Sequence, residues 1–507
     1  MTKKNLILLG FIVLKFLLQF VLISSDYDLH RDEFLHLDQA RHLAWGYMSV
    51  PPFTSWISFL ISMLGNSIFW IRFFPALFGA LTIVVVWKAV EELKGNLFAL
   101  ILSATGVLFS VLLYINTFYQ PNSFDILSWT MLYFAVLKFL KTENRKWLYI
   151  AALVFSIGFL NKYNIIFLVI GLLPALLLTR HRRVFAKKDL YLAVVLALLL
   201  IFPNLMWQYQ HDFPVFHHLR ELTDSQLVNV ERAAFLKTQI LFFFGSLLVI
   251  ISAFYALLFY KPFEKLKPFF WAFIFTLLIF LYFMAKSYYA MGLYPIYIAL
   301  GSVFLADILK KSWGKYVKPV LILLPVLFFM LIVNFIFPNK SPEYVVNNAE
   351  KYQKSGMLRW EDGKDHSLPQ DFADMLGWKE LAQMVDSICA ELPNLENTFI
   401  LCDNYGQAGA INYYTKNKNV IANSYNADYI NWIRLDKPIK NVILVKQPVY
   451  DDDKGRKKEA PFFETVYLAS QRINQYARED TISIYVLKNA NVDVNQIIND
   501  DLAQKRK

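Results

Sequence analysis

The chain has 507 residues, of which 56% are hydrophobic, 17% aromatic and only 18% charged. This composition lies outside the range of ordinary soluble domains and predicts a membrane protein. Lysines and arginines number 51 against 40 acidic residues, which gives a net charge of +11. Such an excess also suits a nucleic-acid-binding protein, but these cations fall in short runs between apolar segments. That pattern is typical of membrane topology and excludes nucleic acid as the expected partner.

The apolar stretches predict about eleven membrane-spanning helices. We expect the first to be a retained anchor rather than a signal peptide, because it is long enough to span, contains Lys15 and Gln19, and ends in SSDYD without an A-x-A cleavage site. The expected spans are 6–24, 70–92, 97–118, 123–140, 147–160, 164–179, 189–207, 236–260, 268–284, 288–309 and 319–337.

Runs of lysine and arginine, such as those at 180–188 and 310–318, fall on alternate connections and predict that these loops and the N-terminus are cytoplasmic. The opposite connections are then extracytoplasmic, and so is the polar tail. They are 25–69, 119–123, 161–163, 208–235 and 285–290.

The tail alternates between strand-like and helical patterns. TFILCDNYG, NVILVKQ and ISIYVLKN are apolar over the length of a strand, whereas DMLGWKELAQMVDSI has helical spacing. We therefore expect a small soluble α/β domain over 338–507, after an α-helical transmembrane domain over 1–337 that includes the outward loop 25–69. Cys389 and Cys402 lie in this tail and fit either a disulfide or two free thiols.

The outward loop from Asp26 to Ile57 is dense in carboxylates, histidines and aromatic residues. A hydroxyl group that attacks an anomeric carbon needs a positioned carboxylate to accept its proton. Asp32 and Glu33 are the candidates for that role. The competing interpretation is that these charges only solvate a loop beside the membrane.

Isolated cations also lie on the predicted extracytoplasmic face, where the positive-inside rule predicts few lysines or arginines. Lys162 lies in GFLNKYN, and Lys286 lies in AKSYYAMGLYP beside Tyr288 and Tyr289. A lysine ammonium group can stabilise a departing phosphate, although either lysine also fits a side chain that only extends from a helix end to the membrane surface. His211 belongs to a histidine-rich segment without the spacing of metal ligands, so no metal site is predicted and a surface or headgroup role is expected.

Several segments together resemble a known family. RDEFLHLDQARHLAWGY followed by a double proline is similar to the first outward loop of the GT-C membrane glycosyltransferases, in the family 39 group of protein O-mannosyltransferases and lipid A aminoarabinose transferases. The other similar segments are TFYQPNSFD, GFLNKYN, FPNLMWQ, AKSYYAMGLYP, DMLGWKELA and NYGQAGAINYY. The resemblance implies a polyprenyl-phosphate sugar donor, a lipid, glycan or protein acceptor, and transfer at the periplasmic face of a bacterial inner membrane.

The resemblance also implies roles for individual residues. The family's Asp-Glu pair falls on Asp32 and Glu33, with Asp32 as the general base, and its phosphate-side lysine and tyrosine fall on Lys162 and Tyr289. Arg31 and Lys286 are further expected phosphate contacts, and Tyr288 and His211 further expected substrate contacts. Many relatives have a second acidic residue where this chain has Asn122, and whether Asp125 substitutes for it stays open. The donor has its own leaving group, so no ATP or redox cofactor is expected, and a divalent metal is neither predicted nor excluded.

Two other classes of function fit many helices and intramembrane cations. One is a transporter or flippase of a lipid or sugar, which would place such groups in broken helices near the membrane midplane. The sequence shows no inverted repeat, and its strongest polar cluster lies in outward loops. The other is a membrane subunit whose tail recruits an extracytoplasmic partner.

Overall fold

The computed structural model describes residues 2–392, 394–449, 451, 453 and 455–506. Contacts between residues divide the chain into two compact units. The first consists of Met1–Ile23, Ala44–Thr54 and Leu64–Asn339, and the second of Ser24–Leu43, Ser55–Met63 and Lys340–Lys507. The last segment of the second unit begins at Lys340, whereas the sequence placed the start of the tail near residue 338. Most of loop 25–69, which we had expected in the transmembrane domain, belongs to the second unit.

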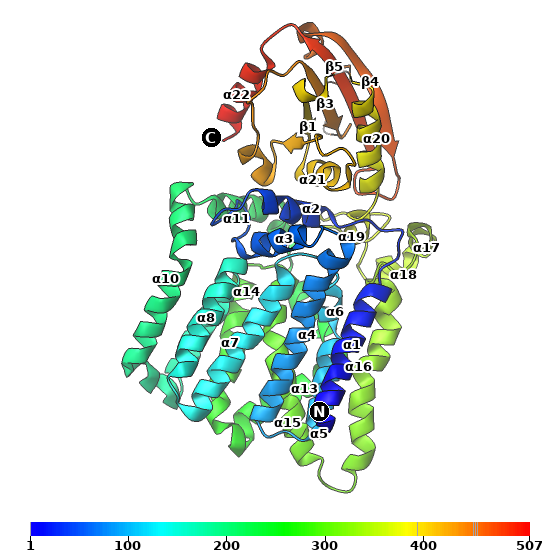
Figure 1. The fold of residues 1–507 in the computed structure, drawn as a ribbon. Coiled ribbons are helices and arrows are strands. Elements are labelled where there is room, and N and C mark those ends of the chain that lie inside the picture. Colours follow the sequence, from blue (N-terminus) through cyan, green and yellow to red (C-terminus); the bar gives the residue numbers. More distant parts are fainter. Residues whose placement is uncertain (1, 393, 450, 452, 454, 507) are drawn as a thin grey trace. The chain divides into compact units, whose positions relative to one another are not determined.

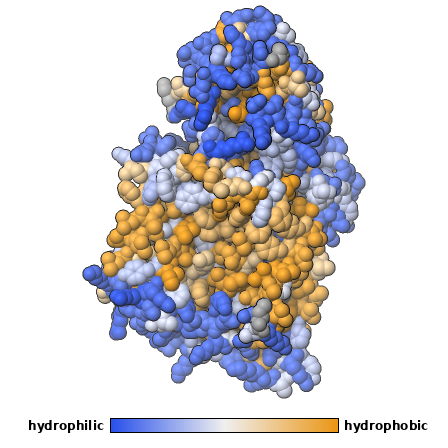
Figure 2. Space-filling view, in the orientation of Figure 1, coloured by the Kyte–Doolittle hydropathy of each residue, from blue (hydrophilic) through white to orange (hydrophobic). Residues whose placement is uncertain are grey.

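The first unit is a bundle of helices (Figure 1). Figure 2 shows hydrophobic residues in a band across these helices, with hydrophilic residues where the loops gather. Its helices are α1 (Lys3–Val21), α4 (Ile68–Glu92), α5 (Leu97–Leu108), α6 (Val111–Ile115), α7 (Asn122–Thr142), α8 (Lys146–Asn161), α9 (Ile165–Leu177), α10 (Lys188–Gln210), α11 (Pro214–Ser225), α12 (Arg232–Phe242), α13 (Leu247–Phe259), α14 (Lys267–Tyr282), α15 (Tyr294–Ile308) and α16 (Gly314–Ile336).

The multi-pass membrane character predicted from composition is confirmed by the length of these helices. Within the described residues, seven helices are long and apolar enough to cross a membrane, or up to nine if each of two bent pairs is one span. The other two of the eleven predicted spans, 97–118 and 147–160, correspond to shorter apolar helices, α5 and α8.

Some predicted spans are broken. The stretch 236–260 forms α12 and α13, bent by 65° at the break. Gly245 lies in this break and packs so closely on α16 that a Cβ atom there would be 2.7 Å from the Pro325 Cα. The stretch 97–118 breaks at Ser110, whose hydroxyl accepts a hydrogen bond from the Leu112 amide and starts α6. Hydrophobic length predicts where the chain crosses, but such local packing decides where a helix breaks.

The second unit contains a five-stranded sheet in the order β2-β1-β3-β5-β4 (Figure 1). Strand β1 pairs parallel with β2 and β3, whereas β5 pairs antiparallel with β3 and β4. The strands are β1 (Thr398–Cys402), β2 (Ala422–Ser424), β3 (Asn441–Lys446), β4 (Phe463–Ile473) and β5 (Thr481–Ala490). The helices of this part of the chain are α2 (Arg31–Asp38), α3 (Phe53–Met63, its Ser55–Met63 part), α17 (Pro342–Asn347), α18 (Ala349–Lys354), α19 (Gln370–Ala373), α20 (Trp378–Ala390), α21 (Tyr405–Tyr414) and α22 (Val494–Lys505).

The predicted α/β domain is thus present, with the three predicted strands as β1, β3 and β5 and the predicted helix as α20. Helix α2 joins it because Phe34 is fully buried between α20 and α21. Its ring lies 6.2 Å from that of Trp378 and 5.7 Å from that of Tyr414. Cys389 and Cys402 are both buried free thiols.

Candidate active site

In the first unit, Lys162 is at the centre of a group of polar side chains from three separate segments. Its Nζ donates a hydrogen bond to Asn122 Oδ1 at 2.7 Å. The same ammonium group lies over two tyrosine rings, 4.3 Å from the centroid of Tyr289 and 5.1 Å from that of Tyr288. The predicted outward turns 119–123, 161–163 and 285–290 therefore meet at Lys162.

The turn that carries Lys162 is fixed by its neighbours in the sequence. Helix α8 ends at Asn161, whose side-chain amide donates to the Pro121 carbonyl oxygen at 2.9 Å. On the other side of Lys162, the Tyr163 hydroxyl donates to Asn204 Oδ1 of α10 at 3.1 Å. Lys162 itself has an extended backbone between these two anchors. The turn is therefore attached to two neighbouring segments of the bundle.

Asp125 lies beside this group, in the first turn of α7, and is almost fully buried. Its Oδ1 accepts from Trp129 Nε1 at 3.0 Å, and its Oδ2 accepts from Asn164 Nδ2 at 2.9 Å. The Asn164 amide also donates to the Tyr289 carbonyl oxygen at 2.9 Å. Asp125 thus anchors the tyrosine segment through Asn164.

The electrostatics at Lys162 favour an anionic ligand. Burial lowers the pKa of Lys162 to about 8, the Asp125 carboxylate opposes that shift, and the positive Lys286 adds to it. Lys162 forms no ion pair with a carboxylate in the described parts of the chain. An ammonium group has three N–H donors, and Asn122 takes one of them. The remaining donors, with the nearby charge of Lys286, can bind a phosphate oxygen.

The histidine-rich segment places His211 at the surface. His211 stacks on Trp207, with ring centroids 4.1 Å apart, and its Nδ1 lies 2.8 Å from the Trp207 carbonyl oxygen. The histidine that lies near Lys286 is His218 instead: burial lowers its pKa, Glu221 opposes this, and the Lys286 charge adds to it. Lys286 also lies 6.0 Å from the Tyr288 ring centroid.

In the second unit, Asp32 has a partner from the C-terminal part of the chain. Its Oδ1 accepts a hydrogen bond from the Tyr405 hydroxyl at 2.6 Å, and its Oδ2 lies 3.8 Å from His30 Nδ1. Its side chain is still 37% exposed. Burial would raise the pKa of Asp32, but His30, Arg31 and the Tyr405 hydrogen bond outweigh burial and lower it. Asp32 is therefore ionised at neutral pH, as a general base must be.

Glu33 has a different environment from Asp32. Its side chain is fully buried, and its Oε2 accepts a hydrogen bond from the His30 backbone N–H at 2.6 Å. This bond belongs to a capping box that begins α2. The geometry gives Glu33 a structural contact and leaves Asp32 as the accessible carboxylate of the pair.

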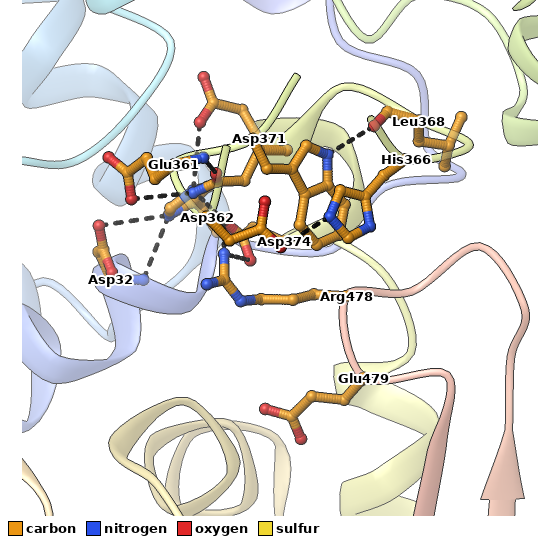
Figure 3. A network of polar contacts seen from close by, with 12 residues as sticks. Asp32, Glu361, Asp362, His366, Leu368, Asp371, Asp374, Arg478 and Glu479 are labelled. Atoms are coloured by element: carbon orange, nitrogen blue, oxygen red, sulfur yellow. Dashed lines mark hydrogen bonds and ion pairs between the residues drawn. The ribbon is translucent and has the colours of Figure 1, made fainter. Parts of the chain in front are cut away.

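A network of ion pairs surrounds His30. Figure 3 shows Asp32, Asp371, Asp374 and Arg478, which belong to it. His30 Nε2 lies 3.6 Å from Asp374 Oδ2 and 3.9 Å from Asp371 Oδ1. Arg478 Nη1 donates to both carboxylate oxygens of Asp374, each at 3.1 Å. Arg31 lies against the Tyr405 ring in the same network, 4.7 Å from its centroid.

The three residues His30, Asp371 and Asp374 are close enough together to hold a metal ion. Burial would lower the pKa of His30, but the three neighbouring carboxylates raise it to about 9. Asp374 is already paired with Arg478, which donates to both of its carboxylate oxygens. The donor set therefore fits an ion-pair network better than a metal centre.

Sequence reasoning missed several residues that contact the candidate groups: Trp129, Asn164, Asp374 and Tyr405. Three of them lie in segments that carry the family resemblance, Asn164 in GFLNKYN, Asp374 in DMLGWKELA and Tyr405 in NYGQAGAINYY. Those segments were the available signal, but Lys162 was the residue selected from them.

Comparisons with known proteins agree with this fold. Residues 49–207 match the family described as dolichyl-phosphate-mannose-protein mannosyltransferase. Lipid A galacturonosyltransferase RgtD from Rhizobium johnstonii is 30% identical over 241 residues, which cover 45% of this chain and 48% of RgtD. The chain thus matches about half the length of that curated relative.

Among solved structures, ArnT from Cupriavidus metallidurans bound to undecaprenyl phosphate superposes with a TM-score of 0.61 at 15% identity, covering 96% of this chain and 98% of ArnT. The apo state of the same protein gives a TM-score of 0.57 at 13% identity, covering 97% and 99%. The chain therefore has the fold of ArnT, and the predicted resemblance to the GT-C membrane glycosyltransferases is confirmed.

Proposed function

We propose that this chain is a glycosyltransferase that moves a sugar from a polyprenyl-phosphate-linked donor to a lipid, glycan or protein acceptor. The observation that carries the proposal is the group around Lys162, where an ammonium without a carboxylate partner in the described structure lies among Asn122 and two tyrosines. Asn122, Asp125 and Lys162 all lie within the matched residues 49–207. The likeness to ArnT bound to undecaprenyl phosphate supports a lipid phosphate as the ligand.

In the proposed reaction, the Asp32 carboxylate accepts the proton of the acceptor hydroxyl group. The hydroxyl oxygen forms a bond to the anomeric carbon while the bond between that carbon and the phosphate oxygen breaks. The polyprenyl phosphate leaves with the electron pair, and Lys162 and Lys286 stabilise its charge. Attack opposite the leaving group inverts the anomeric configuration. Glu33 supports the start of α2, and Arg31 contributes positive charge beside Asp32.

The test is transfer of label from a panel of radiolabelled polyprenyl-phosphate sugars into membrane acceptors by the purified chain. We expect Asp32→Asn to lower the rate by about 10² to 10⁴, as for other general bases. Lys162→Ala should lower it by about 10² or more. Two controls should keep wild-type rates: Lys315→Ala, whose exposed ammonium lies over Tyr316, and Asp501→Asn, whose carboxylate accepts from Tyr425.

Undiminished transfer by both site variants would remove the proposed site, and no transfer from any donor by the wild type would overturn the proposed activity. The membrane face is tested separately. We propose a periplasmic site in a bacterial inner membrane from the distribution of lysine and arginine between the loops. A membrane-impermeant acceptor should then be glycosylated by spheroplasts and not by sealed inverted vesicles, and the reverse result would place the site in the cytoplasm.

A further inference from the structure

The C-terminal part of the chain brings a hydroxyl group into contact with the proposed base. Tyr405 is the first residue of α21, and its hydroxyl donates to Asp32 Oδ1 at 2.6 Å. We propose that Tyr405 is a positioning residue for the Asp32 carboxylate, so that residues 340–507 contribute directly to the acceptor-activating site. This inference rests on the proposed function and goes beyond it, because it gives the C-terminal domain a role in the reaction.

The start of α21 is held firmly enough for such a role. Asn404 caps the helix, and its Oδ1 accepts from the Gly406 and Gln407 amides at 2.9 and 3.1 Å. The Asn404 side-chain amide donates to Glu479 Oε1 at 2.8 Å, and that of Gln407 donates to Glu479 Oε2 at 2.6 Å. Glu479 therefore ties the first turn of α21 to the segment before β5. Tyr405 extends from this fixed turn.

Two glycines let α21 approach α2 closely. A Cβ atom at Gly409 would lie 2.6 Å from the Phe34 Cβ, and one at Gly406 would lie 3.4 Å from the Arg31 Cβ. The first distance is too short for any side chain, so Gly409 is required for this approach. The spacing of Gly406 and Gly409 places both on the side of α21 that faces α2. The contact that carries Tyr405 to Asp32 is therefore built into the packing of two helices.

Other charged groups also face Asp32 and shift its pKa together with Tyr405. His30 and Arg31 lower the pKa of Asp32, as the Tyr405 hydrogen bond does, whereas the Asp374 charge raises it. The Asp32 charge in turn favours a higher pKa for His36 of the same helix, and the Glu479 charge favours a higher pKa for Arg31. The charges of His30 and Arg31 stabilise the ionised carboxylate, and a charge effect has little directionality. The Tyr405 hydroxyl donates a directional hydrogen bond to Oδ1, and so it helps to orient the carboxylate group.

The test is Tyr405→Phe, which removes only the hydroxyl group. Without the donated hydrogen bond, the ionised form of Asp32 is less stable and its pKa rises. The acid limb of the pH profile of kcat should therefore move to higher pH, and kcat on the plateau should fall about tenfold or more because the base is less well oriented. The KM for the donor should change little, because the inference gives Tyr405 no contact with the lipid phosphate.

Tyr429→Phe is the matched control. The Tyr429 hydroxyl donates to Asp38 Oδ2 at 2.6 Å, a bond of the same kind to the same helix α2 but to a different carboxylate. This variant should lose stability without a shift of the acid limb. If Tyr429→Phe shifts the limb as much as Tyr405→Phe does, the effect comes from loosening α2 and the inference fails.

A second measurement does not depend on transfer. Carbodiimide modifies protonated carboxyl groups, so the pH dependence of Asp32 labelling, read by mass spectrometry on the intact detergent-solubilised chain, reports its protonation. The labelling midpoint should rise in Tyr405→Phe and not in Tyr429→Phe. An unchanged midpoint would overturn the inference even in an active enzyme. If the midpoint rises but the wild-type chain transfers no sugar, the contact between Tyr405 and Asp32 is supported and the proposed activity is rejected.

Discussion

At the scale of single residues, the chemistry of the first unit depends on how one half-buried lysine, Lys162, keeps its proton. Lys162 has a pKa of about 8, held there against burial by the Asp125 charge. A protonated lysine is needed to stabilise a leaving phosphate, so activity should fall as the pH rises through about 8. Asp125 receives its two hydrogen bonds from neutral groups, Trp129 and Asn164, and so keeps its charge for Lys162.

Asp125→Asn should therefore move the alkaline limb of the pH profile to lower pH. The sign follows because removal of a neighbouring negative charge lowers the pKa of a lysine, so the ammonium group is lost earlier as the pH rises. The measurement is the rate of transfer from pH 6 to 10. Trp129→Phe, which removes one donor to Asp125 and leaves the charge, should shift the limb less. An unshifted limb in Asp125→Asn would show that Asp125 does not act on the titrating group.

The same scale shows what the sequence could predict about the site. Asp32, Lys162 and Lys286 were selected as candidates because a charge beside apolar segments is conspicuous in a linear sequence. Tyr405 and Asn164 were not, because neutral polar residues are common and their role depends on a distant partner. The hydrogen bond of Tyr405 to Asp32 joins residues separated by 373 positions, and that of Asn164 to Asp125 joins residues 39 apart. Only the folded chain brings such pairs together.

At the scale of elements, the short helix α2 depends on its capping box. The buried Glu33 accepts from the His30 amide, which fixes the helix start that carries Asp32. Glu33→Ala should lower the free energy of unfolding by about 1 kcal/mol, whereas Glu33→Gln keeps an acceptor and should cost less. Thermal unfolding in detergent measures both changes.

Activity separates this structural role from a catalytic one. If Glu33 only caps α2, Glu33→Gln should transfer sugar within a few-fold of the wild-type rate, while Asp32→Asn is inactive. A loss in Glu33→Gln as large as that in Asp32→Asn, with stability intact, would instead place Glu33 in the reaction. The pattern D-E in the sequence predicts two candidates, the family resemblance favours Asp32 as the base, and their burial separates the two in the structure.

Hydrophobic length predicted the helices of the first unit well, because a membrane requires long apolar segments whatever their neighbours are. It predicted 236–260 and 97–118 as continuous, since the breaks at Gly245 and Ser110 depend on local packing and capping. In the second unit, β1, β3 and β5 were visible as buried apolar runs. Strand β4 buries Phe463 and Arg472, and its other residues are exposed or half-buried, so it carries no comparable apolar signal.

At the scale of the whole molecule, the second unit is assembled from both ends of the chain. Ser24–Leu43 and Ser55–Met63 belong with Lys340–Lys507, although more than 270 residues of the first unit separate them in sequence. Sequence order suggested a simple division near residue 338, because a linear pattern does not show which later segment buries an early helix. Phe34, buried against Trp378 and Tyr414, is the clearest sign of that burial.

This assembly predicts the result of cutting the chain between its units. A specific protease site inserted between Asn339 and Lys340, cleaved after folding, should leave both fragments together in size-exclusion chromatography. The early segment remains buried in the second unit, and exposing Phe34 alone would cost about 1.5 to 3 kcal/mol. Phe34→Ala should therefore weaken the association and let the C-terminal fragment dissociate in mild denaturant at lower concentration. Tyr405 reaches Asp32 through the same packing, so the cleaved enzyme should keep its pH profile as long as its fragments stay associated. A C-terminal fragment that separates freely in native buffer would contradict the assembly.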